Sequence, residues 1–154
     1  MFSLFLVVHI CTGVICLISG IFAFSSKKKK GRHSVSGEIY HGSYVFVFVT
    51  ALIMSVIHWQ ESHYLFYIAL FSYGLALWGY VAVKRKWTNW LGSHIGGMLG
   101  SYIGIVTATL VVNVHRIPVM NELPVLIYWF LPTMIGTPII FKVGQKYKPR
   151  KRLH

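Results

Sequence analysis

Long uncharged apolar runs constrain this chain more than any other feature of its sequence. The hydrocarbon core of a bilayer is about 30 Å thick and needs roughly 20 apolar residues per helix, and the sequence offers about five such runs. They cover residues 2–24, 39–58, 64–83, 90–113 and 125–141. Hydrophobic residues make up 55% of the chain and charged residues 12%, against about 45–50% and roughly 25% in soluble domains. The sequence therefore predicts an all-α integral membrane helical bundle and excludes a soluble globular fold.

Basic residues alternate with these runs. Every Lys and Arg except Arg116 falls after the first run, after the third run, or in the tail 142–154. Because cytoplasmic loops of membrane proteins are enriched in Lys and Arg, we expect an external N-terminus and a basic cytoplasmic tail. The first run has no basic residue before it, the reverse of a cleavable signal peptide, so we expect it to stay as an anchor. Residues 1–154 are thus predicted to form one transmembrane bundle.

The net charge is +12, with 15 Lys and Arg against 3 Asp and Glu. Apolar runs separate these basic residues, a pattern that argues against nucleic-acid binding. Basic loops beside a membrane attract anionic lipids of the inner leaflet, and we expect such lipids as partners. Cys11 and Cys16 lie five apart within the first run, where their side chains diverge, so we expect packing roles and no mutual disulfide.

The fourth run carries two rows of small residues at helical spacing. The first row is Gly92, Gly96, Gly100, Gly104 and Ala108, and the second is Ser93, Gly97 and Ser101. Small residues let membrane helices approach closely, and such faces are often self-complementary, so a homodimer through this run is a possible arrangement. The fifth run contains Pro132 and Pro138, each of which removes a backbone donor, and we expect a kinked or partly unwound helix there.

Histidine is unusually frequent, with 8 residues in the chain. Polar groups inside membrane spans are costly and by default suggest function. His9, His41 and His94 lie within the runs, away from interfacial water. His41 and His94 are predicted near the cytoplasmic surface, and His9 in the outer half. His58, His63 and His115 belong to the outer half as well.

Haem is the first cofactor that this pattern favours, because its iron takes axial histidines while its porphyrin needs apolar walls and basic groups near its propionates. His94 with His41 would form a bis-histidine b-type site near the cytoplasmic face. Helical spacing puts His41 and His58 about 100° apart, and His94 and His115 about 60° apart, which disfavours two sites between the same helices. We therefore expect one site, with His9 as a candidate for an outer one.

Two other interpretations stay open. Glu38, His41 and His94 could instead hold a bare zinc or copper ion, since imidazole suits both metals. Alternatively, the chain is a non-catalytic accessory or small transporter module whose histidines are interfacial. Visible colour or bound metal in the purified protein would separate these three possibilities.

Several short motifs resemble those of a family of uncharacterised multi-span bacterial membrane proteins. The motifs are a first-run histidine (His9-x-x-x-Gly13), then His33-x-x-x-Gly37-x-x-Tyr40, then His94-x-x-x-Met98 ahead of Ser101-Tyr102. This resemblance implies a bacterial cytoplasmic membrane protein and brings no activity with it. It favours His33 as well as His41 as a partner of His94. It also singles out Tyr40, Met98 and Tyr102, which we expect to line the pocket. Electron transfer with a quinone or a partner subunit is the expected function.

Overall fold

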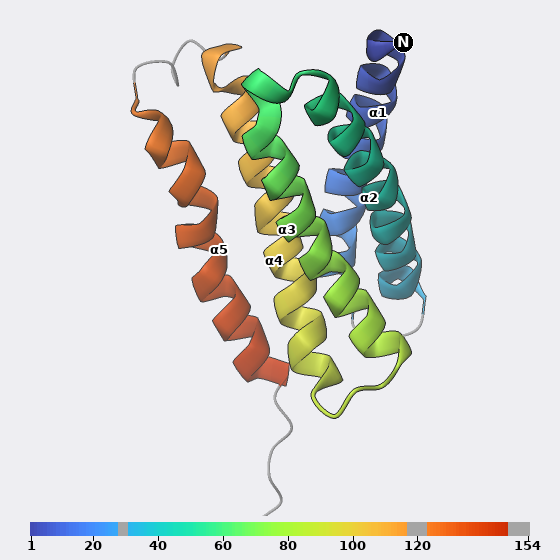
Figure 1. The fold of residues 1–154 in the computed structure, drawn as a ribbon. Helices are drawn as coiled ribbons and strands as arrows, with labels where there is room; N and C mark the ends of the chain where they lie inside the picture. The colour runs from blue at the N-terminus through green and yellow to red at the C-terminus, as the bar shows by residue number, and fades with distance from the viewer. Residues whose placement is uncertain (28–30, 117–122, 148–154) are drawn as a thin grey trace, which may run out of the picture. The chain divides into compact units, whose positions relative to one another are not determined.

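The computed structural model describes residues 1–27, 31–116 and 123–147. Within these ranges the chain folds into five α-helices and one short 3₁₀ helix, with no strand (Figure 1). They are α1 (Phe2–Ser25), α2 (Arg32–Ile57), α3 (Trp59–Lys84), α4 (Trp90–Asn113), η1 (Val114–Arg116) and α5 (Val125–Tyr147). Each α-helix is long and apolar enough to cross a membrane. The predicted all-α, multi-pass membrane fold is confirmed, while its orientation stays a prediction.

The helices extend beyond the apolar runs. α2 begins at Arg32 instead of near residue 39, and α3 begins at Trp59 instead of near residue 64. Hydropathy marks the part of a helix that fits the hydrocarbon, whereas backbone hydrogen bonds continue into polar residues at the membrane surface. His58 alone therefore separates α2 from α3, and its carbonyl accepts hydrogen bonds from the backbone N–H groups of Glu61 and Ser62. Likewise, α5 runs through Lys142 to Tyr147, and the rest of the predicted tail lies outside the described residues.

The contacts between residues divide the chain into two compact units, and each is described by itself. The first unit is Met1–Gly74, which contains α1, α2 and the first part of α3. The second is Leu75–His154, which contains the last part of α3 together with α4, η1 and α5.

In the first unit, α1 and α2 pack as an antiparallel pair (Figure 1). Their interface buries small and aromatic side chains, among them Cys16, Ala23, Tyr40 and Tyr44. A weak hydrogen bond joins the two helices here, because the Cys16 thiol lies 3.6 Å from the Tyr40 carbonyl oxygen. In lipid, such polar contacts and close packing hold helices together, since the hydrophobic effect does not.

In the second unit, α3 and α4 approach backbone to backbone at two glycines. A Cβ built on Gly97 would lie 2.6 Å from the Leu75 carbonyl oxygen and 2.7 Å from the Gly79 Cα. A Cβ built on Gly79 would in turn lie 3.0 Å from the backbone nitrogen of Met98. The second of the two rows, with Ser93, Gly97 and Ser101 all buried, thus forms this contact.

The first row meets side chains at two of its glycines, because a Cβ on Gly100 would lie 3.2 Å from the Leu75 Cδ1 atom and one on Gly92 would lie 2.9 Å from the Asn89 amide. A Cβ on Gly96 would meet nothing within 4 Å. Sequence alone offered both rows, and the structure assigns the tight contact with α3 to the row containing Gly97. A homodimer through the row containing Gly96 stays a prediction.

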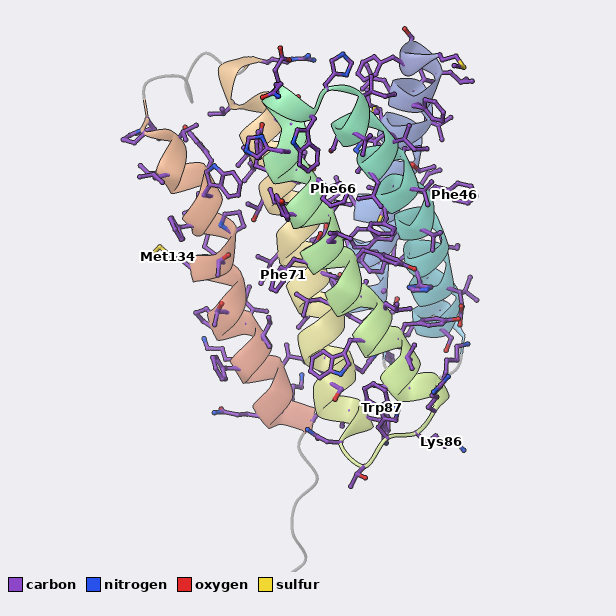
Figure 2. The ribbon with its side chains drawn as sticks, viewed as in Figure 1. Phe46, Phe66, Phe71, Lys86, Trp87 and Met134 are labelled. Carbon is purple, nitrogen blue, oxygen red and sulfur yellow. The ribbon has the colours of Figure 1, made fainter. Side chains whose placement is uncertain are left out.

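The helix α5 packs against α4, with Gly136 placed against the side chain of Ile103. Tyr128 is the buried residue of α5, whose other large apolar side chains are mostly exposed. Met134, which projects away from the helix in Figure 2, is 71% exposed and suits a lipid-facing surface. Both Pro132 and Pro138 lie inside a continuous α-helix, so the segment is not unwound.

Candidate cofactor-binding histidines

His94 lies about one turn into α4 and is half-buried. Its Nδ1 atom is 3.2 Å from the carbonyl oxygen of Gly79 on α3. A carbonyl only accepts hydrogen bonds, so Nδ1 carries the proton and donates it. In the neutral ring, Nε2 then carries the lone pair, and Nε2 is the atom that would bind a metal.

The local sequence explains this arrangement. The contact between Gly79 and Gly97 lets the two backbones approach, and this approach brings the Gly79 carbonyl within reach of the His94 ring. Met98 is buried one turn after His94, and Tyr102 is half-buried one turn further. Because side chains four residues apart share a helix face, these three residues lie on one side of α4.

His33 shows the same chemistry in the first unit. It lies in the first turn of α2, and its Nδ1 atom is 2.9 Å from the carbonyl oxygen of Ala23. This oxygen belongs to the last turn of α1, where carbonyls have no partner within their own helix. His33 thus donates from Nδ1 to a carbonyl at the end of α1, and Nε2 is the acceptor nitrogen of its neutral ring.

His9 joins α1 to α2 through a side chain. Its Nδ1 atom lies 2.9 Å from the Thr50 hydroxyl oxygen, which is itself 2.7 Å from the Phe46 carbonyl oxygen. Because that carbonyl takes the hydroxyl proton, the imidazole donates from Nδ1 to the hydroxyl lone pair. His9 is therefore an interhelical contact, and its Nε2 is the nitrogen left to accept.

His41 lies beside a group of aromatic rings. Its ring stacks on Tyr73 of α3, with centroids 6.0 Å apart and an interplanar angle of 22°. Tyr73 also stacks on Phe48 at 4.5 Å and meets Tyr44 edge-on at 5.8 Å. Tyr40 meets Tyr44 at 5.5 Å and is 1% exposed. We call these five residues the aromatic cluster.

The proposed bare metal site draws on both units. Glu38 is exposed and lies one turn before His41 on α2, while His94 belongs to the second unit. In the described part of the chain, no three His, Cys, Asp or Glu side chains gather closely enough to hold a metal ion. The pairing of His94 with His41 or His33 and the set of Glu38, His41 and His94 stay predictions.

The remaining histidines differ from these. His58 is exposed, and its ring meets that of Phe2 edge-on at 4.5 Å. His63 is exposed too, with Nδ1 3.3 Å from the Trp59 carbonyl oxygen of its own helix. The side chain of His115 lies outside the described residues. A second site formed by these three histidines also stays a prediction.

Sequence reasoning missed Gly79, Thr50 and Tyr73, the partners of His94, His9 and His41. A backbone carbonyl leaves no trace in residue type, so nothing in the sequence could reveal Gly79. The contact between His41 and Tyr73 could in principle have been predicted, because a turn at His58 makes α2 and α3 antiparallel and brings residues before and after the turn together. We expected a loop between the second and third runs instead of a turn at His58, and this loop would have paired different residues of the two helices.

Comparison with known proteins adds no further constraint. No protein-family model, curated protein or solved structure matches the chain. The membership implied by the short motifs therefore stays a prediction. The function has to be argued from the histidines themselves and from the membrane-spanning helices around them.

Proposed function

We propose that this protein is a membrane electron carrier that binds b-type haem through histidine. His94 is one axial ligand in this proposal, and His33 or His41 is the other. The partner in electron transfer is a membrane quinone or another subunit. When bound, haem iron supplies a site that gains and loses one electron.

The observation that carries the proposal is the hydrogen bond from His94 to the Gly79 carbonyl. Histidines that ligate metals usually donate their second ring N–H to a carbonyl or carboxylate, which fixes the tautomer and the orientation of the ring. His94 has this arrangement across two helices, and His33 has it across another two. The same argument favours His33 over His41 as the second ligand.

The chemistry around these histidines supports the proposal. Met98 and Tyr40 are buried and Tyr102 is half-buried, so each can supply apolar wall to a porphyrin. Lys84 lies near the same end of its unit as His94, since α3 ends there and α4 begins there. Arg32 directly precedes His33. Such cations suit haem propionates, which are negative at neutral pH.

The test is a reduced-minus-oxidised visible spectrum of protein purified in detergent. We expect a Soret band and a sharp alpha band that are lost in His94→Ala. His63→Ala is the matched control, because its ring bonds to its own helix and is exposed, and it should leave the spectrum unchanged. His33→Ala and His41→Ala identify the second ligand. Haem iron with two histidine ligands is low-spin, so the change that removes the second ligand should give a high-spin spectrum or abolish the haem spectrum.

The other outcomes of the same experiment are informative. A colourless protein with one equivalent of zinc or copper by elemental analysis would replace haem by a bare metal site. A colourless protein without metal would leave the accessory or transport function. A spectrum that survives His94→Ala would refute this ligand assignment.

A further inference from the structure

The turn between α3 and α4 lies where two membrane-spanning helices end. α3 finishes at Lys84 and α4 begins at Trp90, and both helices are long and apolar enough to cross a bilayer. A turn of irregular backbone cannot sit in hydrocarbon, because its polar groups would lack partners there. The residues between the two helices therefore lie at the depth of the lipid headgroups. We call residues 84–90 the basic turn.

The chemistry of the basic turn suits a phosphodiester. Lys84, Arg85 and Lys86 follow one another, and the turn contains no acidic residue. Trp87 and Trp90 are 38% and 42% exposed, and tryptophan is enriched at the level of lipid headgroups. Figure 2 shows Lys86 reaching outward from the turn, with Trp87 beside it.

The backbone of the turn gives an independent reason to single out Lys86. The N–H of Trp87 bonds the Ala82 carbonyl at 3.2 Å, and the N–H of Lys86 bonds the Val83 carbonyl at 3.3 Å. This pair of bonds is the Schellman motif, whose penultimate position adopts a left-handed conformation and is usually glycine. Lys86 occupies that position with a φ of 49°. A lysine is strained there relative to glycine, so the geometry of the turn does not explain its presence.

We propose that the basic turn binds the headgroup of an anionic phospholipid. The cations of Arg85 and Lys86 contact the phosphodiester, and the indoles of Trp87 and Trp90 pack at the level of the glycerol esters. A bilayer supplies this ligand at high local concentration beside the turn, which favours a lipid over a soluble anion. The lipid contacts are assigned to Arg85 and Lys86, whereas Lys84 is the cation of this turn that suits a haem propionate, so lipid binding can be tested whether or not haem is bound.

The experiment measures thermal unfolding of the protein in uncharged detergent while short-chain phosphatidylglycerol or phosphatidylcholine is added. A ligand that binds the folded state raises the unfolding temperature, so the titration gives an apparent affinity. We expect phosphatidylglycerol to bind more tightly than phosphatidylcholine. Lys86→Asn, which removes the charge and tolerates a left-handed backbone, should weaken the phosphatidylglycerol affinity about fivefold, the effect of one cation at a membrane surface.

Two further variants make the result specific. Lys142→Asn removes an exposed charge on α5, outside the turn, and should lower the affinity less than Lys86→Asn does, because salt screens exposed charges that do not contact the lipid. Lys86→Gly should lose the same affinity while unfolding at an equal or higher temperature than wild type without lipid, because glycine relieves the strain.

Three results would overturn the proposal. Equal losses in the Lys86 and Lys142 variants would mean that net charge, and not the turn, attracts the lipid. Equal responses to the two lipids would mean that the turn has no headgroup preference. An equal rise with inorganic phosphate at the same concentration would make the ligand a free anion.

Discussion

The contact between Gly97 and α3 makes a sharp prediction about a single methyl group. In Gly97→Ala the new Cβ would lie 2.6 Å from the Leu75 carbonyl oxygen and 2.7 Å from the Gly79 Cα. Both are backbone atoms, which cannot rotate aside as a side chain can. Carbon atoms reach favourable contact at about 3.5–4.0 Å, so the two helices must separate by about 1 Å. Overpacking of this kind typically costs about 1–3 kcal/mol.

The control is the neighbouring glycine. A Cβ at Gly96 would meet nothing within 4 Å, and alanine stabilises a helix by about 1 kcal/mol relative to glycine. Gly96→Ala should therefore unfold at the same temperature as wild type or higher. With roughly 2–4 °C of melting temperature per kcal/mol, Gly97→Ala should unfold about 5 °C lower.

The assay is thermal unfolding of the three proteins in the same detergent, followed by circular dichroism. The same separation should stretch the hydrogen bond from His94 to Gly79, which is 3.2 Å in the wild-type protein. Equal stability of Gly97→Ala and Gly96→Ala would refute the assigned contact between α3 and α4. A stable Gly96→Ala with an unstable Gly97→Ala would confirm which of the two rows packs.

Two further predictions concern the first unit. Thr50→Val removes the acceptor of the His9 ring and should destabilise the protein by about 0.6 kcal/mol, the average for an interhelical hydrogen bond in a membrane. Thr109 is an exposed residue whose hydroxyl bonds a carbonyl of its own helix, so Thr109→Val should be near neutral, and equal effects of the two changes would contradict the role of His9. Cys11 lies on the exposed surface of α1 and Cys16 is 0% exposed. A small membrane-permeant maleimide should therefore label Cys11 faster than Cys16 in detergent, as mass spectrometry of the labelled peptides would show, and faster labelling of Cys16 would contradict its burial.

Candidate site residues divide according to what each contact involves. His94 could be selected from the sequence because a polar ring inside an apolar run is costly and needs a reason to be there. Its partner could not, because the Gly79 carbonyl is a backbone group that every residue type possesses. The hydrogen bond from His33 to the Ala23 carbonyl escaped prediction for the same reason. The stacking of His41 on Tyr73 depends on where the turn between α2 and α3 lies, and that turn proved shorter than expected.

By itself, the sequence determined that the chain is helical and crosses a membrane several times. A bilayer of fixed thickness demands apolar runs of about 20 residues and forces every backbone hydrogen bond inside the helix, so composition and length suffice for this conclusion. Only the tertiary structure decided that the row with Gly97 meets α3 while Gly96 stays open, and that His94 reaches a carbonyl of another helix. Neighbouring positions on a helix differ by about 100° in direction, so two rows of equally small residues become distinct only when a second backbone lies against one of them.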